Sequence, residues 1–323
     1  MRFLAVALAR LAVAATWTTL SPLPHGTLQE HITLPISSTQ LVTLGGLVSN
    51  GSTTTLSLLY NIPTDKWTIM TPSLPIALNH PNAAVASGKI YLLGGLTGVS
   101  SWRATADCFV FDIASQTWSP LTAMPASEAR GSAASVAYNN TIYLAGGITS
   151  SGGRTVDTVS AYHISSNTWI SNSLPEVARR LPEARDHAGY AIVGSKFYVL
   201  GGRANGATAV KDTVFILDLA DLQKGWRAVE MKMPTARGGL VAAAVGEKIY
   251  TFGGEGNPAA GKRGVFEQVE VFDTATEKWE SVGAMKLPRH GTSAVTVDGK
   301  VYIPGGAVVQ GMGGTEAFDV FSP

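Results

Sequence analysis

The stretch KIYLLGG, residues 89–95, decides the fold, because close copies of it return along the whole chain. The copies are TIYLAGG at 141–147, KFYVLGG at 196–202, KIYTFGG at 248–254 and KVYIPGG at 300–306, with a weaker one, QLVTLGG, at 40–46. Successive Gly-Gly pairs stand 49, 52, 55, 52 and 52 residues apart. A near-constant period of about 50 residues indicates a repeat architecture, and each apolar run predicts a buried strand.

Each repeat carries the same order of features after its Gly-Gly pair. An aromatic-Asp strand such as FVFD (109–112) is followed by a tryptophan and a Leu-Pro or Met-Pro turn. The tryptophans are Trp67, Trp118, Trp169, Trp226 and Trp279, and four copies continue to Arg130, Arg185, Arg237 and Arg289. This pattern resembles the kelch repeat, whose copies each form one four-stranded blade of a β-propeller. The resemblance implies an all-β, six-bladed kelch-type propeller in which the Gly, Tyr and Trp columns are structural.

The last repeat lacks one strand, and the N-terminal part of the chain has a strand to supply. The aromatic-Asp strand of that repeat lies at Phe318-Asp319, and no tryptophan strand follows it before Pro323. The missing strand matches TWTTL, residues 16–20, with Trp17. We therefore expect the N-terminal strand to complete the last blade and close the ring, since closure removes an open sheet edge. The propeller is expected over residues 16–323.

The first fifteen residues have the features of a secretory signal peptide. Arg2 precedes an apolar stretch that runs from Phe3 to Ala15, ends in small residues and is too short to span a bilayer. Residues 1–15 are therefore predicted to be a signal peptide, which implies secretion; the alternative is an uncleaved tail. Two sequons, at Asn50 and Asn139, are compatible with glycosylation on that route.

Composition excludes several classes of partner and cofactor. The net charge is +1, charged residues make up 15%, and no block of like charges occurs, so we expect no nucleic acid as a partner. The single cysteine, Cys108, excludes a disulfide within this sequence. P-loop, dinucleotide-binding and nucleophile-elbow motifs are absent. We expect a monomer that spans no membrane and has no cofactor and no metal ion.

Candidate ligand residues come from three columns at one end of the propeller axis, here called the mouth. Fourteen residues before each Gly-Gly pair stand His31, His80, Ser132, His187, Gly239 and Gly291. The preceding positions hold Glu30, Asn79, Gly131, Asp186, Gly238 and His290, and the positions after the pairs hold Leu47, Leu96, Ile148, Arg203, Glu255 and Ala307. Convergent polar groups beside small residues that leave room predict a ligand site. The alternative is that each histidine only hydrogen-bonds a neighbouring loop.

Roles within the mouth follow from side-chain chemistry. The catalytic candidates, which would polarise a carbonyl group, are His80, His187, Asn79 and Arg203. The ligand-binding candidates are Glu30, His31, Trp102, Asp186, Glu255 and His290. Trp102 is the one tryptophan outside the repeat and opening strands, and it is expected to stack on a ligand or to anchor its loop. A metal ion held by His31, His80 and His290 is a weaker alternative.

Two functions from different classes remain. The leader and the TWTTLSPLP opening (16–24) resemble small secreted fungal kelch-type propellers. That resemblance implies a cofactor-free natural-product cyclase, similar to the hetero-Diels–Alderases, acting on a small organic molecule. The alternative is a non-catalytic module that recognises a glycan or a protein. A deep apolar site favours the cyclase, and an exposed polar site favours glycan recognition.

Overall fold

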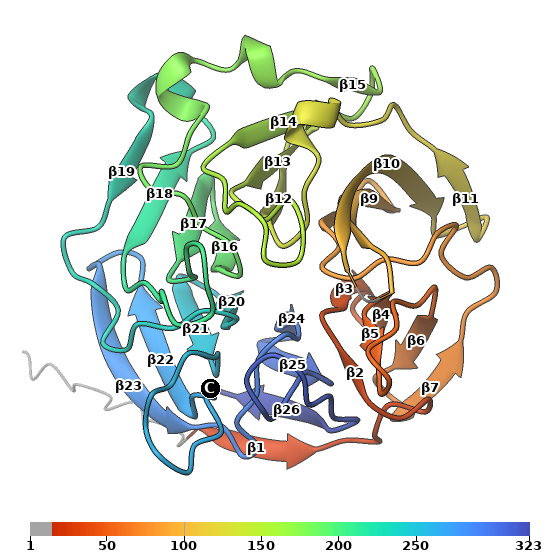
Figure 1. Ribbon diagram of the computed structural model, residues 1–323, viewed down its shortest axis with the longest axis vertical. Coiled ribbons are helices and arrows are strands. Elements are labelled where there is room, and N and C mark those ends of the chain that lie inside the picture. The colour runs from red at the N-terminus through yellow and green to blue at the C-terminus, as the bar shows by residue number, and fades with distance from the viewer. Residues whose placement is uncertain (1–14, 100) are drawn as a thin grey trace, which may run out of the picture.

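Six four-stranded antiparallel sheets surround a central axis in the computed structural model, which describes residues 15–99 and 101–323 (Figure 1). The predicted six-bladed propeller is confirmed. Blade 1 consists of β3 (Ile32–Ser37), β4 (Gln40–Leu44), β6 (Ser57–Asn61) and β7 (Lys66–Ile69). Blade 2 consists of β8 (Ala83–Ala86), β9 (Lys89–Thr97), β10 (Arg103–Asp112) and β11 (Thr117–Pro120). Blade 3 consists of β12 (Ala134–Tyr138), β13 (Thr141–Ala145), β14 (Val159–His163) and β15 (Thr168–Trp169).

The second half of the chain repeats this order. Blade 4 consists of β16 (Gly189–Val193), β17 (Lys196–Leu200), β18 (Val214–Asp218) and β19 (Trp226–Ala228). Blade 5 consists of β20 (Val241–Val245), β21 (Lys248–Phe252), β22 (Gln268–Asp273) and β23 (Lys278–Ala284). Blade 6 consists of β24 (Val295–Val297), β25 (Lys300–Pro304), β26 (Phe318–Ser322) and β1 (Thr16–Thr19). The strand named first in each blade borders the axis, and in blade 6 this strand is β24 (Figure 1).

A few short elements lie outside the blades. A two-stranded ribbon pairs β2 (Leu28–Gln29) with β5 (Leu47–Val48). Four single 3-10 turns occupy connecting loops: η1 (Ala126–Glu128), η2 (Ser171–Ser173), η3 (Glu176–Ala178) and η4 (Leu222–Lys224). Across the described residues, no helix has the length and apolar character that crossing a membrane requires.

The N-terminal strand closes the ring as predicted. In Figure 1, β1 lies along β26, and the pairing sets Thr16 opposite Ser322 and Thr19 opposite Asp319. The Trp17 ring packs 5.0 Å from that of Phe321 in its own blade and 5.9 Å from that of Phe252 in blade 5. The N-terminal strand therefore completes blade 6, and its tryptophan packs that blade against blade 5. Residues 1–14 of the predicted signal peptide lie outside the described residues.

After its first residue, the second strand of each blade is buried and mainly apolar, because neighbouring blades cover both of its faces. In β9, Ile90 and Leu92 pack into the core shared with blade 1. Tyr91 and Leu93, which alternate with them, pack into the core shared with blade 3. Alternating side chains of a strand point to opposite faces, so a sheet buried on both faces needs an unbroken apolar run.

The Gly-Gly and Trp columns have the structural roles expected of them. Gly45 adopts φ +66°, and a Cβ there would lie 2.4 Å from the Leu78 carbonyl oxygen, so a side chain does not fit. Trp67 donates its Nε1 hydrogen to the Ser21 carbonyl at 2.9 Å, and Trp169 donates to that of Thr122 at 3.1 Å. These tryptophans hydrogen-bond segments from outside their own blades.

Candidate functional site

Six residues with left-handed backbone form a ring around the axis, each two to four residues before the inner strand of its blade. Their φ angles lie between 48° and 60°. This axial ring consists of Glu30, His80, Ser132, His187, Gly239 and Gly291. Backbone N–H groups link successive members: Glu30 donates to the Gly291 carbonyl at 2.7 Å, and His80 donates to that of Glu30 at 2.8 Å. The ring brings residues from six distant segments of the chain together around the axis.

The predicted position of His31 in this ring is wrong, because Glu30 occupies it. A β-bulge between Pro35 and Ser37 adds one residue to β3, so the spacing to the Gly-Gly pair is longer in blade 1 than in the others. His31 is instead buried against blade 6, next to the space above Gly305. Burial there lowers the pKa of His31 to about 4. The residue before the ring position in blade 1 is correspondingly Gln29.

Three ring side chains meet on the axis. His80 Nε2 lies 3.0 Å from His187 Nε2 and 3.1 Å from Glu30 Oε2. One candidate ligand atom from each residue lies within 4.8 Å of the others, so this trio replaces the His31-containing metal set as the geometric candidate. All three side chains are at most 10% exposed. His80 of blade 2 thus contacts a buried residue of blade 1 and another of blade 4.

The other predicted polar residues surround this trio. His187 Nδ1 donates to Asp186 Oδ1 at 2.6 Å, and Arg203 Nε donates to the same oxygen at 3.0 Å. Arg203 also donates to Glu255 Oε1 and, through Nη2 at 3.2 Å, to His187 Nε2. We call the assembly the polar cluster; its members are Glu30, Asn79, His80, Asp186, His187, Arg203, Glu255 and His290. All the predicted mouth residues except His31 and Trp102 belong to it.

Burial controls the charge states in the polar cluster. It lowers the pKa of His80 to about 3 and also lowers that of His187, with Arg203 adding to both shifts. Burial alone would raise the pKa of Asp186, but the His187 hydrogen bond and the Arg203 charge outweigh it and lower that pKa to about 2. The pKa of Arg203 is raised by Glu255 and Asp186 against the effect of burial. Both imidazoles are therefore neutral near pH 7, and Arg203 is charged.

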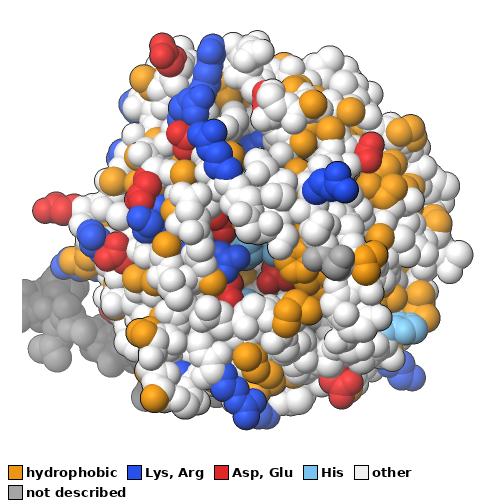
Figure 2. All heavy atoms as spheres, viewed as in Figure 1, with side chains coloured by type: hydrophobic (Ala, Val, Ile, Leu, Met, Phe, Trp, Pro, Cys, Tyr) orange, Lys and Arg blue, Asp and Glu red, His pale blue; other side chains and the backbone are white. Residues whose placement is uncertain are grey.

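The polar cluster fills the mouth instead of leaving it open. A Cβ on Gly291 would lie 2.4 Å from Glu30 Oε1, and one on Gly239 would lie 3.2 Å from Glu255 Cγ. The room predicted beside Gly239 is therefore occupied by the Glu255 side chain, and the space beside Gly291 is occupied by the Glu30 carboxylate. Charged and histidine side chains lie at the centre of the hollow in Figure 2. The Trp102 ring stands 5.4 Å from the His80 ring, beside the cluster.

Behind the polar cluster, the axis holds a cavity of about 430 Å³. Its wall is made by the six inner strands and is mainly apolar, with Ile32, Leu34, Val85, Val136, Ile192, Val241 and Val295. Glu30 is the one carboxylate in the wall among the described residues. Pro35, in the second half of β3, lines the cavity and is exposed, so the cavity reaches solvent at the end of the axis opposite the axial ring.

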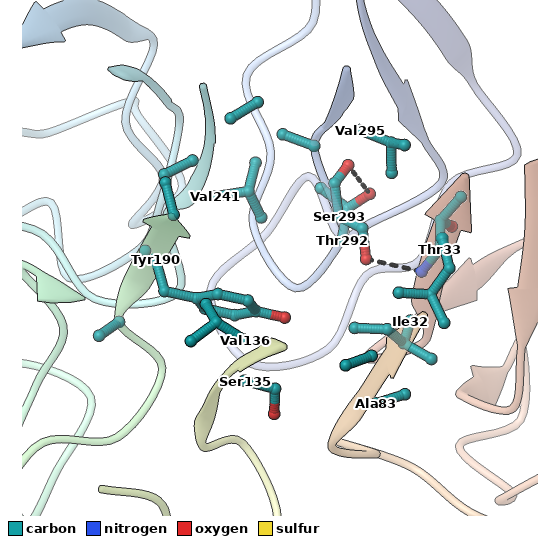
Figure 3. Close-up of a pocket in the computed structure, with 18 of the residues that line it drawn as sticks. Ile32, Thr33, Ala83, Ser135, Val136, Tyr190, Val241, Thr292, Ser293 and Val295 are labelled. Carbon is teal, nitrogen blue, oxygen red and sulfur yellow. Dashed lines mark hydrogen bonds between the residues drawn. The ribbon is translucent and has the colours of Figure 1, made fainter. Parts of the chain in front are cut away.

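Tyr190 is the functional candidate that the sequence analysis missed. Its ring projects from β16 into the middle of the cavity (Figure 3). Burial raises the pKa of its phenol to about 12, and no described residue contributes a hydrogen bond to it. The third residue after the axial ring is small in the other blades (Thr33, Ala83, Ser135, Ala242 and Ala294). A lone tyrosine in this column is the signal that a blade-by-blade comparison would have found.

Comparison with known proteins assigns the repeat. The model of the KLHDC2/KLHL20/DRC7 Kelch-repeats domain matches residues 31–188 and 132–321. The chain belongs to the kelch-repeat family. Kelch-like protein terF of Aspergillus terreus is 39% identical over 309 residues, which cover 91% of this chain and 64% of terF. Kelch domain-containing protein 3 of Homo sapiens is 27% identical over 263 residues, 75% of this chain and 66% of the relative.

More distant kelch proteins extend the same similarity. Alpha-scruin of Limulus polyphemus is 28% identical over 253 residues, 75% of this chain and 26% of that protein. The chain therefore spans just under two thirds of the length of terF and of Kelch domain-containing protein 3, and a smaller part of alpha-scruin. The similarity assigns the family and its propeller.

The two predicted glycosylation sites are on the surface. Asn50 and Asn139 are both exposed, so a glycan would meet no steric barrier from burial at either asparagine. Their modification and the secretory route stay predictions.

Proposed function

We propose that this kelch propeller is a cyclase that binds a small, mainly apolar organic molecule in the axial cavity and closes a ring in it without a redox cofactor. The observation that carries the proposal is the cavity itself: about 430 Å³, with apolar walls and one phenol directed into it. Small-molecule sites have this composition, with a few polar groups that orient the ligand. The volume lies in the range of such sites.

Tyr190 supplies the chemistry that a cycloaddition needs from a protein. With its pKa raised to about 12, the phenol is protonated at neutral pH and acts as a hydrogen-bond donor. A donor that meets a carbonyl oxygen of the ligand stabilises negative charge that develops there as the new bonds form. The new bonds form between atoms of the bound molecules, so no proton or electron leaves the site.

The apolar wall contributes by holding the reacting atoms close together. Confinement of two reacting groups in one geometry removes the entropy cost of bringing them together, which is worth about 7–11 kcal/mol in the best cases. The cavity excludes water on most sides, which strengthens the Tyr190 hydrogen bond. The polar cluster closes the inner end, so a ligand enters from the end that Pro35 lines. A cavity so apolar favours the cyclase over glycan recognition.

The test is an incubation of the purified full chain with a small-molecule extract of its own source, followed by chiral chromatography and mass spectrometry. We expect a new or stereochemically enriched product that a boiled sample does not form. Tyr190→Phe keeps the shape of the cavity and should slow product formation about 100-fold, the effect of losing one well-placed donor. His163→Asn, at the end of β14, is the control and should be as active as the wild type.

Two results would contradict the proposal. Product formation that is equally fast in Tyr190→Phe would remove the phenol from the reaction. Retention of an unchanged compound by the folded wild-type protein, with no product formed, would make the cavity a binding site without catalysis.

A further inference from the structure

The contacts behind His80 determine which of its ring nitrogens carries hydrogen. The Thr53 hydroxyl donates to the Gly98 carbonyl, so its oxygen is the acceptor for Asn79 Nδ2 at 2.8 Å. This turns Asn79 Oδ1 toward His80 Nδ1, at 2.6 Å. An amide oxygen only accepts hydrogen bonds, so Nδ1 carries the hydrogen. In the neutral imidazole, His80 Nε2 then presents a lone pair on the axis.

The same logic holds for His187. Asp186 is a pure acceptor: its Oδ2 receives the Thr155 hydroxyl, and its Oδ1 receives His187 Nδ1 at 2.6 Å. His187 Nδ1 therefore carries hydrogen, and Nε2 presents a second lone pair. A carboxylate or amide oxygen behind the distal ring nitrogen is the usual support of a metal-binding histidine, because it fixes the ring and makes Nε2 more basic.

Three acceptor atoms consequently point at one another: the Nε2 atoms of His80 and His187, 3.0 Å apart, and Glu30 Oε2, 3.1 Å from the first of them. Acceptors in contact without a hydrogen between them repel, and burial strengthens the repulsion. In a tetrahedral zinc site, metal–ligand distances of 2.0–2.2 Å would place neighbouring ligand atoms about 3.3–3.6 Å apart. Both observed separations are slightly shorter, so the ion would enter as the three repelling side chains move apart by a few tenths of an ångström.

We infer that Glu30, His80 and His187 bind one divalent transition-metal ion of the zinc type at the inner end of the axial cavity. Two imidazoles and one carboxylate are a donor set that such ions prefer. All three residues line the cavity, so a further coordination position is open toward it. The ion joins blades 1, 2 and 4 across the axis.

The charge of the polar cluster fits a divalent cation. It contains three carboxylates, from Glu30, Asp186 and Glu255, and one guanidinium, from Arg203. The charges of these four groups sum to −2, which a divalent ion balances. Arg203 keeps its contacts with Asp186 and Glu255 when the ion takes over His187 Nε2, so the guanidinium needs no new partner.

The test uses tag-free full chain that has been treated with EDTA, dialysed and titrated with ZnCl₂ in a calorimeter. We expect one Zn²⁺ per chain. His187→Gln and Glu30→Gln should each weaken binding at least about 100-fold, since each removes one ligand atom. His163→Asn, which changes a histidine outside the polar cluster, should bind Zn²⁺ as the wild type does.

A second measurement keeps the inference testable if the ligand variants do not fold, which circular dichroism would reveal. Crystals of the wild-type chain grown with ZnCl₂ should show an anomalous difference peak at the zinc edge between Glu30, His80 and His187. A folded wild-type chain that binds no Zn²⁺, an anomalous peak only elsewhere, or unchanged binding in folded His187→Gln would overturn the inference. In the first case, a proton shared by the two imidazoles is the alternative occupant.

Discussion

Four buried arginines show how single residues hold the blades together. Arg130, Arg185, Arg237 and Arg289 are each at most 1% exposed. Arg237 donates to the Gly253 and Gln268 carbonyls and pairs with Glu270 at 2.7 Å. A buried charge is tolerated when it is paired and hydrogen-bonded in this way. The arginines that recur in the sequence motif are therefore buried residues that stabilise the blades.

Replacing Arg237 with alanine should destabilise the protein strongly. The change leaves the buried Glu270 carboxylate without its cation, which costs about 3–5 kcal/mol in comparable buried pairs. The matched control is Arg227→Ala, which breaks the more exposed pair with Glu277 and should cost about 0–1 kcal/mol. Urea unfolding followed by circular dichroism measures both. An equal decrease in the free energy of unfolding in the two variants would show that the buried pair is no more important than the exposed one.

Some of the candidate site residues could be predicted from the sequence alone. Fixed spacing from the Gly-Gly pair located His80, His187 and Arg203, because five blades keep the same register. The spacing failed for His31, since a bulge inside β3 leaves no mark in the repeat period. Tyr190 was missed because it lies on an inner strand, where the prediction looked only for structural residues.

Single elements decide whether the ring is closed. β1 is the outer strand of blade 6, and it pairs with β26 at the other end of the described chain. Trp17 Nε1 donates to the Ala284 carbonyl of blade 5 at 3.1 Å. One four-residue strand from the start of the described chain thus completes blade 6 and also contacts blade 5. Its presence was predictable because the last repeat lacked a tryptophan.

Trp17→Ala should loosen this closure. The variant loses aromatic contacts with Phe252 and Phe321, and we expect the free energy of unfolding to fall by about 2–4 kcal/mol, less than for a fully buried tryptophan. Thr18→Ala changes an exposed residue of the same strand and should alter it by less than about 0.5 kcal/mol. Denaturant titration of both proteins compares them. A Trp17→Ala protein as stable as the wild type would mean that β1 adds little to closure.

The whole molecule creates the feature on which the proposed function depends. The cavity exists because six inner strands, separated by about 50 residues of sequence each, stand around one axis. Its depth and apolar character depend on how those strands tilt and which side chains they turn inward. Repeat spacing does not contain that information, so the sequence led to the polar mouth, and the apolar space behind it became visible only in three dimensions.

The central claim is that a small apolar molecule occupies the axial cavity, and ligand retention tests it most directly. The wild-type chain and Val241→Trp, which fills the cavity from β20, are each exposed to the extract, desalted and analysed by native mass spectrometry. Val99→Trp, on an exposed loop between β9 and β10, is the control. We predict that the wild type and Val99→Trp retain the same compound and that folded Val241→Trp retains none. Equal retention by folded Val241→Trp would contradict the account.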